Sequence, residues 1–287
     1  MILAACALLL AAAAPSPAVA VVVSLTGEAS VQTAASAPSR PLLRFEWLLP
    51  DAKITVGMGS TVVLAFADGS RRELLGGARA RLGAKGLVST SGAVRELPSL
   101  PPLPDLPPLA ADSAASRAGA VRIRGLRIAG LYPRDGWSVP ADSAALGFEP
   151  VPAAGRYRVT VEDEAGATVL EAEVDQPRVA VAAGTLKPGA RYYWRVRTLG
   201  AGGAAYRGEA EFATLDAESA ARRARLGEAL RGEGAAGLAL LAEIDRGLGL
   251  VREARDELRS ALEDAPADAA VREALERLER LLAEPKE

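Results

Sequence analysis

Apolar and polar residues alternate most clearly at residues 191–197, where the apolar positions are Tyr192, Trp194 and Val196. A two-residue period is typical of a β-strand that buries one face. A Pro-Gly pair lies directly before this stretch and signals a turn. The pattern therefore predicts a turn followed by a half-buried strand.

About seven short apolar stretches of this kind occur between residues 119 and 215. Their number and spacing favour a β-sandwich. The expected strands are residues 128–132, 144–148, 157–161, 169–174, 179–181, 191–197 and 209–212. We expect its core to be anchored by Phe148, Tyr157, Leu186, Tyr192 and Trp194.

Residues 21–96 also contain short apolar stretches that are typical of β-strands. An apolar run begins at Val21, and another covers residues 61–66. The second run leads into Asp68-Gly69, a strong hairpin signal because glycine tolerates the positive φ of such turns. This region is predicted to be a separate all-β domain.

The pattern changes to a helical period at residues 216–287. Asp216 is placed to cap a first helix. Residues 235–266 predict two antiparallel helices with Gly249 at the turn, and residues 267–282 predict a further helix. Its apolar stripe is expected to pack within the tail, with a partner helix as the alternative.

Residues 97–118 separate the two β domains. Six prolines between residues 98 and 108 favour an extended, semi-rigid spacer. A proline-rich ligand for an aromatic groove is the alternative.

The first 20 residues carry no charge, and an apolar run of Leu and Ala precedes two prolines and a small-residue site. This favours a signal peptide, residues 1–20, cleaved after Ala20. Two alternatives stay open. The segment is retained as an anchor, or residues 3–6 act as a lipobox and Cys6 carries a lipid.

The amino-acid composition limits the catalytic and metal-binding groups that the chain can offer. The chain has no His and a single Cys, so the usual general base, thiol nucleophiles and thiolate metal sites are missing from the mature protein. No phosphate-binding or hydrolase motif occurs. We expect no enzyme activity, no cofactor and no metal. The net charge of −2 indicates no nucleic-acid partner.

Residues 21–96 resemble the FecR-like domain. The matching stretches are residues 23–27, 48–57, 59–60, 62–69 and 73–75, where glycines and apolar residues follow that family's order. The resemblance implies an all-β fold. For the whole protein it implies a periplasmic regulator that acts on a sigma factor.

Residues 186–196 resemble the corner and strand of a fibronectin type III domain, in which the tyrosine hydroxyl bonds to the backbone just upstream. Residues 235–266 resemble a tetratricopeptide-like repeat. The matching positions are Leu241, Ala242, Gly249, Ala254, Leu258, Ala261 and Pro266.

One face of the predicted sandwich is the candidate binding surface. Its outward positions include Arg158, Tyr193, Arg195 and Arg197, which together suit an acidic polysaccharide or a partner protein. The alternative is a charge-paired solvent face, because Glu209 and Glu211 are expected on the neighbouring strand.

These observations predict a multi-domain, mainly β protein with a helical tail. We expect a non-catalytic exported protein of the cell envelope, periplasmic or outer-membrane associated, that binds or scaffolds a protein or an envelope polysaccharide. Membrane contact is expected only through Cys6 or a retained N-terminal segment. The alternative is a FecR-type regulator, although no cytoplasmic N-terminal segment is recognisable.

Overall fold

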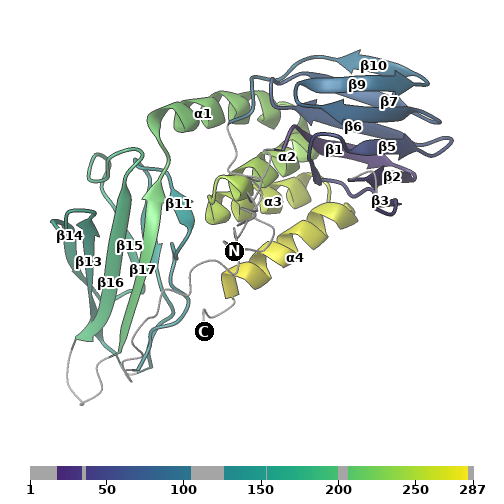
Figure 1. Ribbon diagram of the computed structural model, residues 1–287. Helices are drawn as coiled ribbons and strands as arrows, with labels where there is room; N and C mark the ends of the chain where they lie inside the picture. The colour runs from purple at the N-terminus through teal and green to yellow at the C-terminus, as the bar shows by residue number, and fades with distance from the viewer. Residues whose placement is uncertain (1–17, 34–36, 105–125, 153, 200–205, 284–287) are drawn as a thin grey trace, which may run out of the picture.

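The computed structural model describes residues 18–33, 37–104, 126–152, 154–199 and 206–283. These residues form two β domains and a C-terminal group of helices (Figure 1). The prediction of a mainly β protein with a helical tail is confirmed. Most of the predicted signal peptide, Cys6 and linker residues 105–118 lie outside the described ranges.

The first β domain contains two five-stranded sheets around one core. One sheet has the order β10-β7-β6-β1-β4 and the other β3-β2-β5-β8-β9. Between β1 and β2 the chain turns at Gly27, whose φ is +77° and where a Cβ would lie 2.3 Å from the Ser60 Oγ. The strands are β1 Ala20–Thr26, β2 Ala29–Gln32, β3 Arg40–Pro41, β4 Trp47–Leu48, β5 Lys53–Val56, β6 Thr61–Phe66, β7 Arg71–Leu75, β8 Arg79–Gly83, β9 Gly86–Ser91 and β10 Val94–Leu97.

Strand β1 is buried on both faces. Ala20 and Val22 point into the core between the sheets, whereas Val21 and Val23 pack with residues of the helical tail. A strand covered on both sides has no need of polar alternation. This explains the unbroken apolar run at the start of the domain.

The predicted spacer does not begin at residue 97. Residues 98–104 pack back onto the first β domain, where the backbone N–H groups of Leu100 and Leu103 donate to the carbonyls of Gly69 and Ala67 at 2.9 and 3.0 Å. Both leucines are buried beside the helices. Their apolar side chains, placed between prolines, make this stretch part of the core.

The second β domain is a sandwich. Its larger sheet has the order β11-β17-β16-β13-β14, and the pair β12-β15 contributes the other side of the core. The strands are β11 Trp137–Val139, β12 Ala145–Gly147, β13 Arg156–Asp163, β14 Thr168–Val174, β15 Arg178–Ala180, β16 Arg191–Leu199 and β17 Arg207–Thr214.

The prediction of a first strand at residues 128–132 is wrong. Only single bridges form at its two ends, Arg127 with Arg207 and Tyr132 with Gly147. The segment passes from β17 in one sheet to β12 in the other, so it forms no continuous ladder. The strand that does pair with β17 is β11, in parallel, and the sequence pattern missed it.

All five expected anchors are buried: Phe148, Tyr157, Leu186, Tyr192 and Trp194. The Tyr192 hydroxyl accepts a hydrogen bond from the Lys187 N–H at 2.8 Å, and the Trp194 Nε1 donates to the Pro133 carbonyl at 2.8 Å. Tyr192 and Trp194 thus fill the core with their rings and satisfy their polar atoms against loops.

Four helices form the tail: α1 Ala217–Arg231, α2 Gly234–Gly247, α3 Val251–Asp264 and α4 Ala269–Ala283. Asp216 caps α1 as predicted, accepting from the Ser219 N–H at 2.9 Å. Gly249, with a φ of +79°, makes the tight turn between α2 and α3. None of the described helices is long and apolar enough to cross a membrane.

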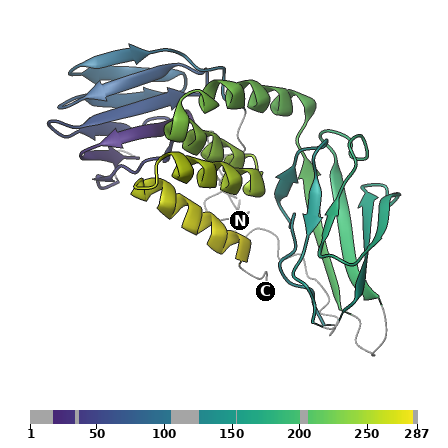
Figure 2. The ribbon, with the colours of Figure 1, turned by 180° about the vertical axis from the view of Figure 1, so that it is seen from behind.

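The tail lies between the two β domains (Figures 1 and 2). Leucines of α1 and α2 share a core with Val21 and Val23 of the first domain. A second core joins α2, α3 and α4 with Phe45 of the first domain and Trp137 of the second. The apolar stripe of the tail is therefore used partly against the β domains, and not only between its own helices.

Candidate functional site

The candidate surface is the outer face of the larger sheet in the second β domain. Residues of β16 alternate strictly between buried and exposed from Arg191 to Arg197, and β13 shows the same alternation. The predicted site residues Arg158, Tyr193, Arg195 and Arg197 all lie on the outer side. Tyr193 is 47% exposed, so an aromatic ring is available to a ligand there.

Part of this face is charge-paired, and one of the two predicted glutamates, Glu211, takes part. Arg195 lies opposite Glu209 in the strand register but forms its ion pair with Glu162 of β13. Glu211 lies opposite Tyr193 and pairs with Arg191 at 3.3 Å. This end of the sheet is a compensated solvent face.

At the other end, arginines outnumber the carboxylates that pair with them. The register places Arg158 directly opposite Arg197, and Arg197 directly opposite Arg207. Arg127 bridges to Arg207 on its far side. We call these four residues the arginine row. Arg197 faces neither of the two glutamates expected on the last strand, because the register brings it level with Arg207, two residues before Glu209.

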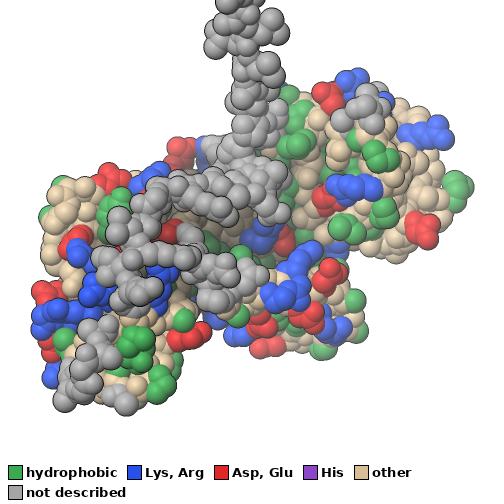
Figure 3. Space-filling model, turned by 60° about the horizontal axis from the view of Figure 1, so that its bottom comes forward, with side chains coloured by type: hydrophobic (Ala, Val, Ile, Leu, Met, Phe, Trp, Pro, Cys, Tyr) green, Lys and Arg blue, Asp and Glu red, His purple; other side chains and the backbone are tan. Residues whose placement is uncertain are grey.

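Two carboxylates of β14, Glu171 and Glu173, border the row, and both pair with Arg158, Glu171 at 3.6 Å. Glu173 of β14 bonds to Arg158 and also pairs with Arg156 at 2.8 Å. The hydrogen bond from Arg158 holds the pKa of Glu173 below its usual value. Among the residues that the structure describes, Arg197, Arg207 and Arg127 form no ion pair. Figure 3 shows basic side chains gathered on the second β domain, at the left of the view.

Arg207 and Arg127 are the members that sequence reasoning missed. The alternation of the last strand already puts Arg207 on the same face as Glu209. Their position beside Arg197 depends on cross-strand register, which a single strand's pattern does not contain.

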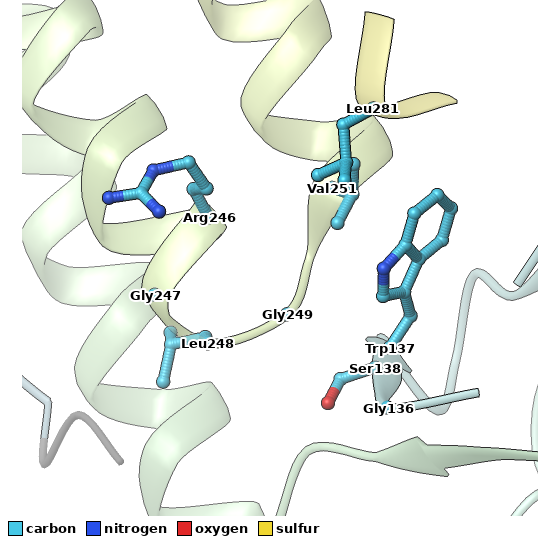
Figure 4. Close-up of a pocket in the computed structure, with 9 residues that line it drawn as sticks. All are labelled: Gly136, Trp137, Ser138, Arg246, Gly247, Leu248, Gly249, Val251 and Leu281. Carbon is cyan, nitrogen blue, oxygen red and sulfur yellow. The ribbon is translucent and has the colours of Figure 1, made fainter. Parts of the chain in front are cut away.

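A cleft of about 300 Å³ lies where the second β domain meets the helices (Figure 4). The Ser138 N–H donates to the Gly249 carbonyl at 2.9 Å, and Trp137 faces Val251 and Leu281. Arg246 is already bonded to Glu243 at 2.8 Å. With its polar groups paired in this way, the cleft is best described as a joint between domains. Its lining residues are Gly136, Trp137, Ser138, Arg246, Gly247, Leu248, Gly249, Val251 and Leu281.

The charged groups buried in the tail are structural. Arg223 of α1 bonds to Asp245 of α2, and Glu253 and Glu257 of α3 lie nearby. Burial raises the pKa of Glu253 and of Glu257. No cluster of side chains suited to a metal ion occurs among the described residues.

The sequence matches no protein-family model and no curated protein. Among solved structures, the chain is similar to the fn3 domain of the human collagen alpha-1(XX) chain, with 21% identity and a TM-score of 0.28, over 36% of this chain and 91% of that one.

Two further structures are similar. CopC from Methylosinus trichosporium OB3b has 22% identity and a TM-score of 0.25, over 32% of this chain and 94% of that one. The chicken CNTN1 FN1-FN3 domains have 10% identity and a TM-score of 0.24, over 65% of this chain and 53% of that one. At these identities and TM-scores the likenesses carry no argument about function.

Proposed function

We propose that this chain is a non-catalytic, exported protein of the cell envelope that binds a ligand on its second β domain and uses its helical tail as a scaffold. The observation that carries the proposal is the pair of cores that the tail shares with both β domains. A ligand held by one domain is thereby kept in a defined position relative to the other. Such an arrangement suits a binding or scaffolding role.

Polar contacts support the same role. Arg44 of the first domain pairs with Asp268 before α4 at 2.5 Å, and Arg71 pairs with Glu233 before α2 at 2.7 Å. Arg134 of the second domain donates to the Leu281 carbonyl of α4. The tail is therefore linked to both domains by charged groups as well as by apolar packing.

The proposal includes a family assignment for each module. The glycine turns at Gly27 and Gly69, which follow that family's order along the chain, support a FecR-like first domain. The bond between Tyr192 and Lys187 supports a fibronectin type III-like second domain. The α2–α3 hairpin, with its buried small residues and Gly249, supports a tetratricopeptide-like tail.

Location and binding test the function together. The chain, tagged at its C-terminus, is expressed in a Gram-negative host, and periplasmic, membrane and cytoplasmic fractions are compared. Export followed by co-sedimentation of the purified protein with isolated envelope material is expected. A chain that stays in the cytoplasm, or that shows no affinity for any envelope fraction, would contradict the proposal.

A further inference from the structure

We infer that the arginine row is a binding site for a linear acidic polysaccharide. The inference rests on the proposed function and names the ligand class of its binding face. It starts from a local conflict. Like charges directly opposite each other on neighbouring strands destabilise a sheet, yet Arg197 faces an arginine on each side. Conflicts of this kind are expected at functional sites, where a ligand supplies the missing partner.

The geometry of the row indicates a polymer. Its four members come from β13, β16, β17 and the segment that bridges to β17, so the row runs across the strands. At about 4.8 Å between neighbouring strands it is about 14 Å long. Arg197, Arg207 and Arg127 are all exposed. A linear chain with repeated negative charges can contact every member at once.

The chemistry of the row favours carboxylate or sulfate groups. Guanidinium is planar, always charged, and bonds to such groups through two parallel N–H donors. Within the row, Glu171 and Glu173 form ion pairs only with Arg158, at the β14 end. The other three arginines keep their donors available for a ligand.

The side chains around the arginine row indicate the class of ligand. Arginines at the centre of a protein interface are accompanied by buried Trp and Tyr anchors, and single-stranded nucleic acid is held by aromatic stacking beside a positively charged groove. The row itself contains only arginines. Exposed Tyr193 lies on the same face of β16, four residues from Arg197. A charged polysaccharide requires nothing more than this arrangement.

Binding of the full-length protein to polygalacturonate and to dextran sulfate tests the inference, with neutral dextran as the negative control. The double variant Arg197→Gln/Arg207→Gln is expected to bind on the order of tenfold more weakly, as loss of charge-assisted bonds implies. The matched control is Arg79→Gln/Arg191→Gln, which removes two exposed arginines elsewhere, one of them on β16. The control is expected to bind as the wild type does.

Stability gives a second readout. Relief of repulsion predicts that Arg197→Gln/Arg207→Gln melts at the same temperature as the wild type or higher, while it binds less well. A purely structural role of the two arginines predicts that the variant loses both thermal stability and affinity. Arg197→Lys/Arg207→Lys keeps the charge and is expected to retain most of the affinity, so the test does not depend on one variant.

Three outcomes would overturn the inference. The first is equal binding by the Gln double variant and the wild type. The second is tighter binding to polyglutamate, single-stranded DNA or phosphatidylglycerol vesicles than to either acidic polysaccharide, which would indicate a protein, nucleic-acid or membrane ligand. The third is envelope co-sedimentation that survives in the Gln double variant, which would reject the row while leaving the proposed function intact.

Discussion

Arg223 of α1 forms a two-bond ion pair with Asp245 of α2, whose side chain is completely buried, and its Nε lies 2.8 Å from the Asp245 Oδ1. The guanidinium stabilises the charge of Asp245 against the cost of burial. The pair joins the first two helices of the tail close to the leucines that contact the first β domain.

Arg223→Met is expected to destabilise the protein by about 3–5 kcal/mol, because it leaves a buried carboxylate without its partner. Denaturant unfolding followed by circular dichroism measures the change. Arg225→Met, on the exposed side of the same helix, is the control and is expected to shift stability by less than about 0.5 kcal/mol. Equal effects of the two substitutions would show that the ion pair does not support the tail.

Tyr192→Phe is expected to destabilise the protein by about 1–1.5 kcal/mol, because the Lys187 N–H loses its acceptor. The exposed neighbour allows a matched control, Tyr193→Phe, whose effect on thermal stability should be close to zero. If both variants have the melting temperature of the wild type, the hydroxyl of Tyr192 does not stabilise the turn before β16.

Gly249→Ala is expected to cost about 1–2 kcal/mol, because alanine is strained at a φ of +79°. The new Cβ would also lie 3.1 Å from the Ser138 nitrogen, at the joint with the second β domain. Gly232→Ala is the control, since this glycine caps α1 with ordinary helical angles and a Cβ there meets nothing closer than 3.6 Å. A higher melting temperature for the Gly249 variant would contradict this account of the turn.

Glu253→Gln is expected to raise the melting temperature at neutral pH. Burial raises the pKa of Glu253 above its ordinary value of 4.5, and the Oε2 is buried without a hydrogen bond. The charged form is therefore penalised in the folded state. That penalty is absent below the ordinary pKa and appears as pH rises through the raised value.

The advantage of Glu253→Gln should accordingly fade as the pH falls from the raised pKa toward 4.5, and it should be absent below 4.5. The groups that influence this carboxyl are Asp245, Arg223 and Arg252. Melting curves of both proteins across this pH range check the prediction. A difference that is constant with pH would assign the effect to something other than ionisation.

Cleavage after Ala20 is expected to damage the first domain. Val19 and Ala20 are buried, and Val19 exchanges backbone hydrogen bonds with Leu48 and Ala67 at 2.8 and 3.3 Å. Protein that begins at Val21 should be less stable than protein that begins at Val19 by about 2 kcal/mol, the worth of burying one valine. Thermal melting of the two forms measures the difference. Equal stability would show that the first domain tolerates cleavage after Ala20.

Local patterns were sufficient for much of this protein. The alternation at residues 191–197, the turn glycines and the capping position of Asp216 each depend on neighbours in the chain. Strand β16, the core anchors and the helix hairpin were therefore predictable from the sequence. The failures share one feature. Residues 128–132, the short parallel strand β11 and residues 98–104 take their structure from distant partners.

The candidate site also combines features that follow from the local sequence with features that depend on distant strands. The outward direction of Arg158, Tyr193, Arg195 and Arg197 follows from the two-residue period of a strand, so the sequence alone determined it. Which charges stand side by side was decided by register, and a shift of two residues would have placed Arg197 opposite Glu209. Only the tertiary structure decided that one end of the sheet pairs its charges and the other aligns four arginines, because cross-strand neighbours are chosen by the packing of the whole sheet.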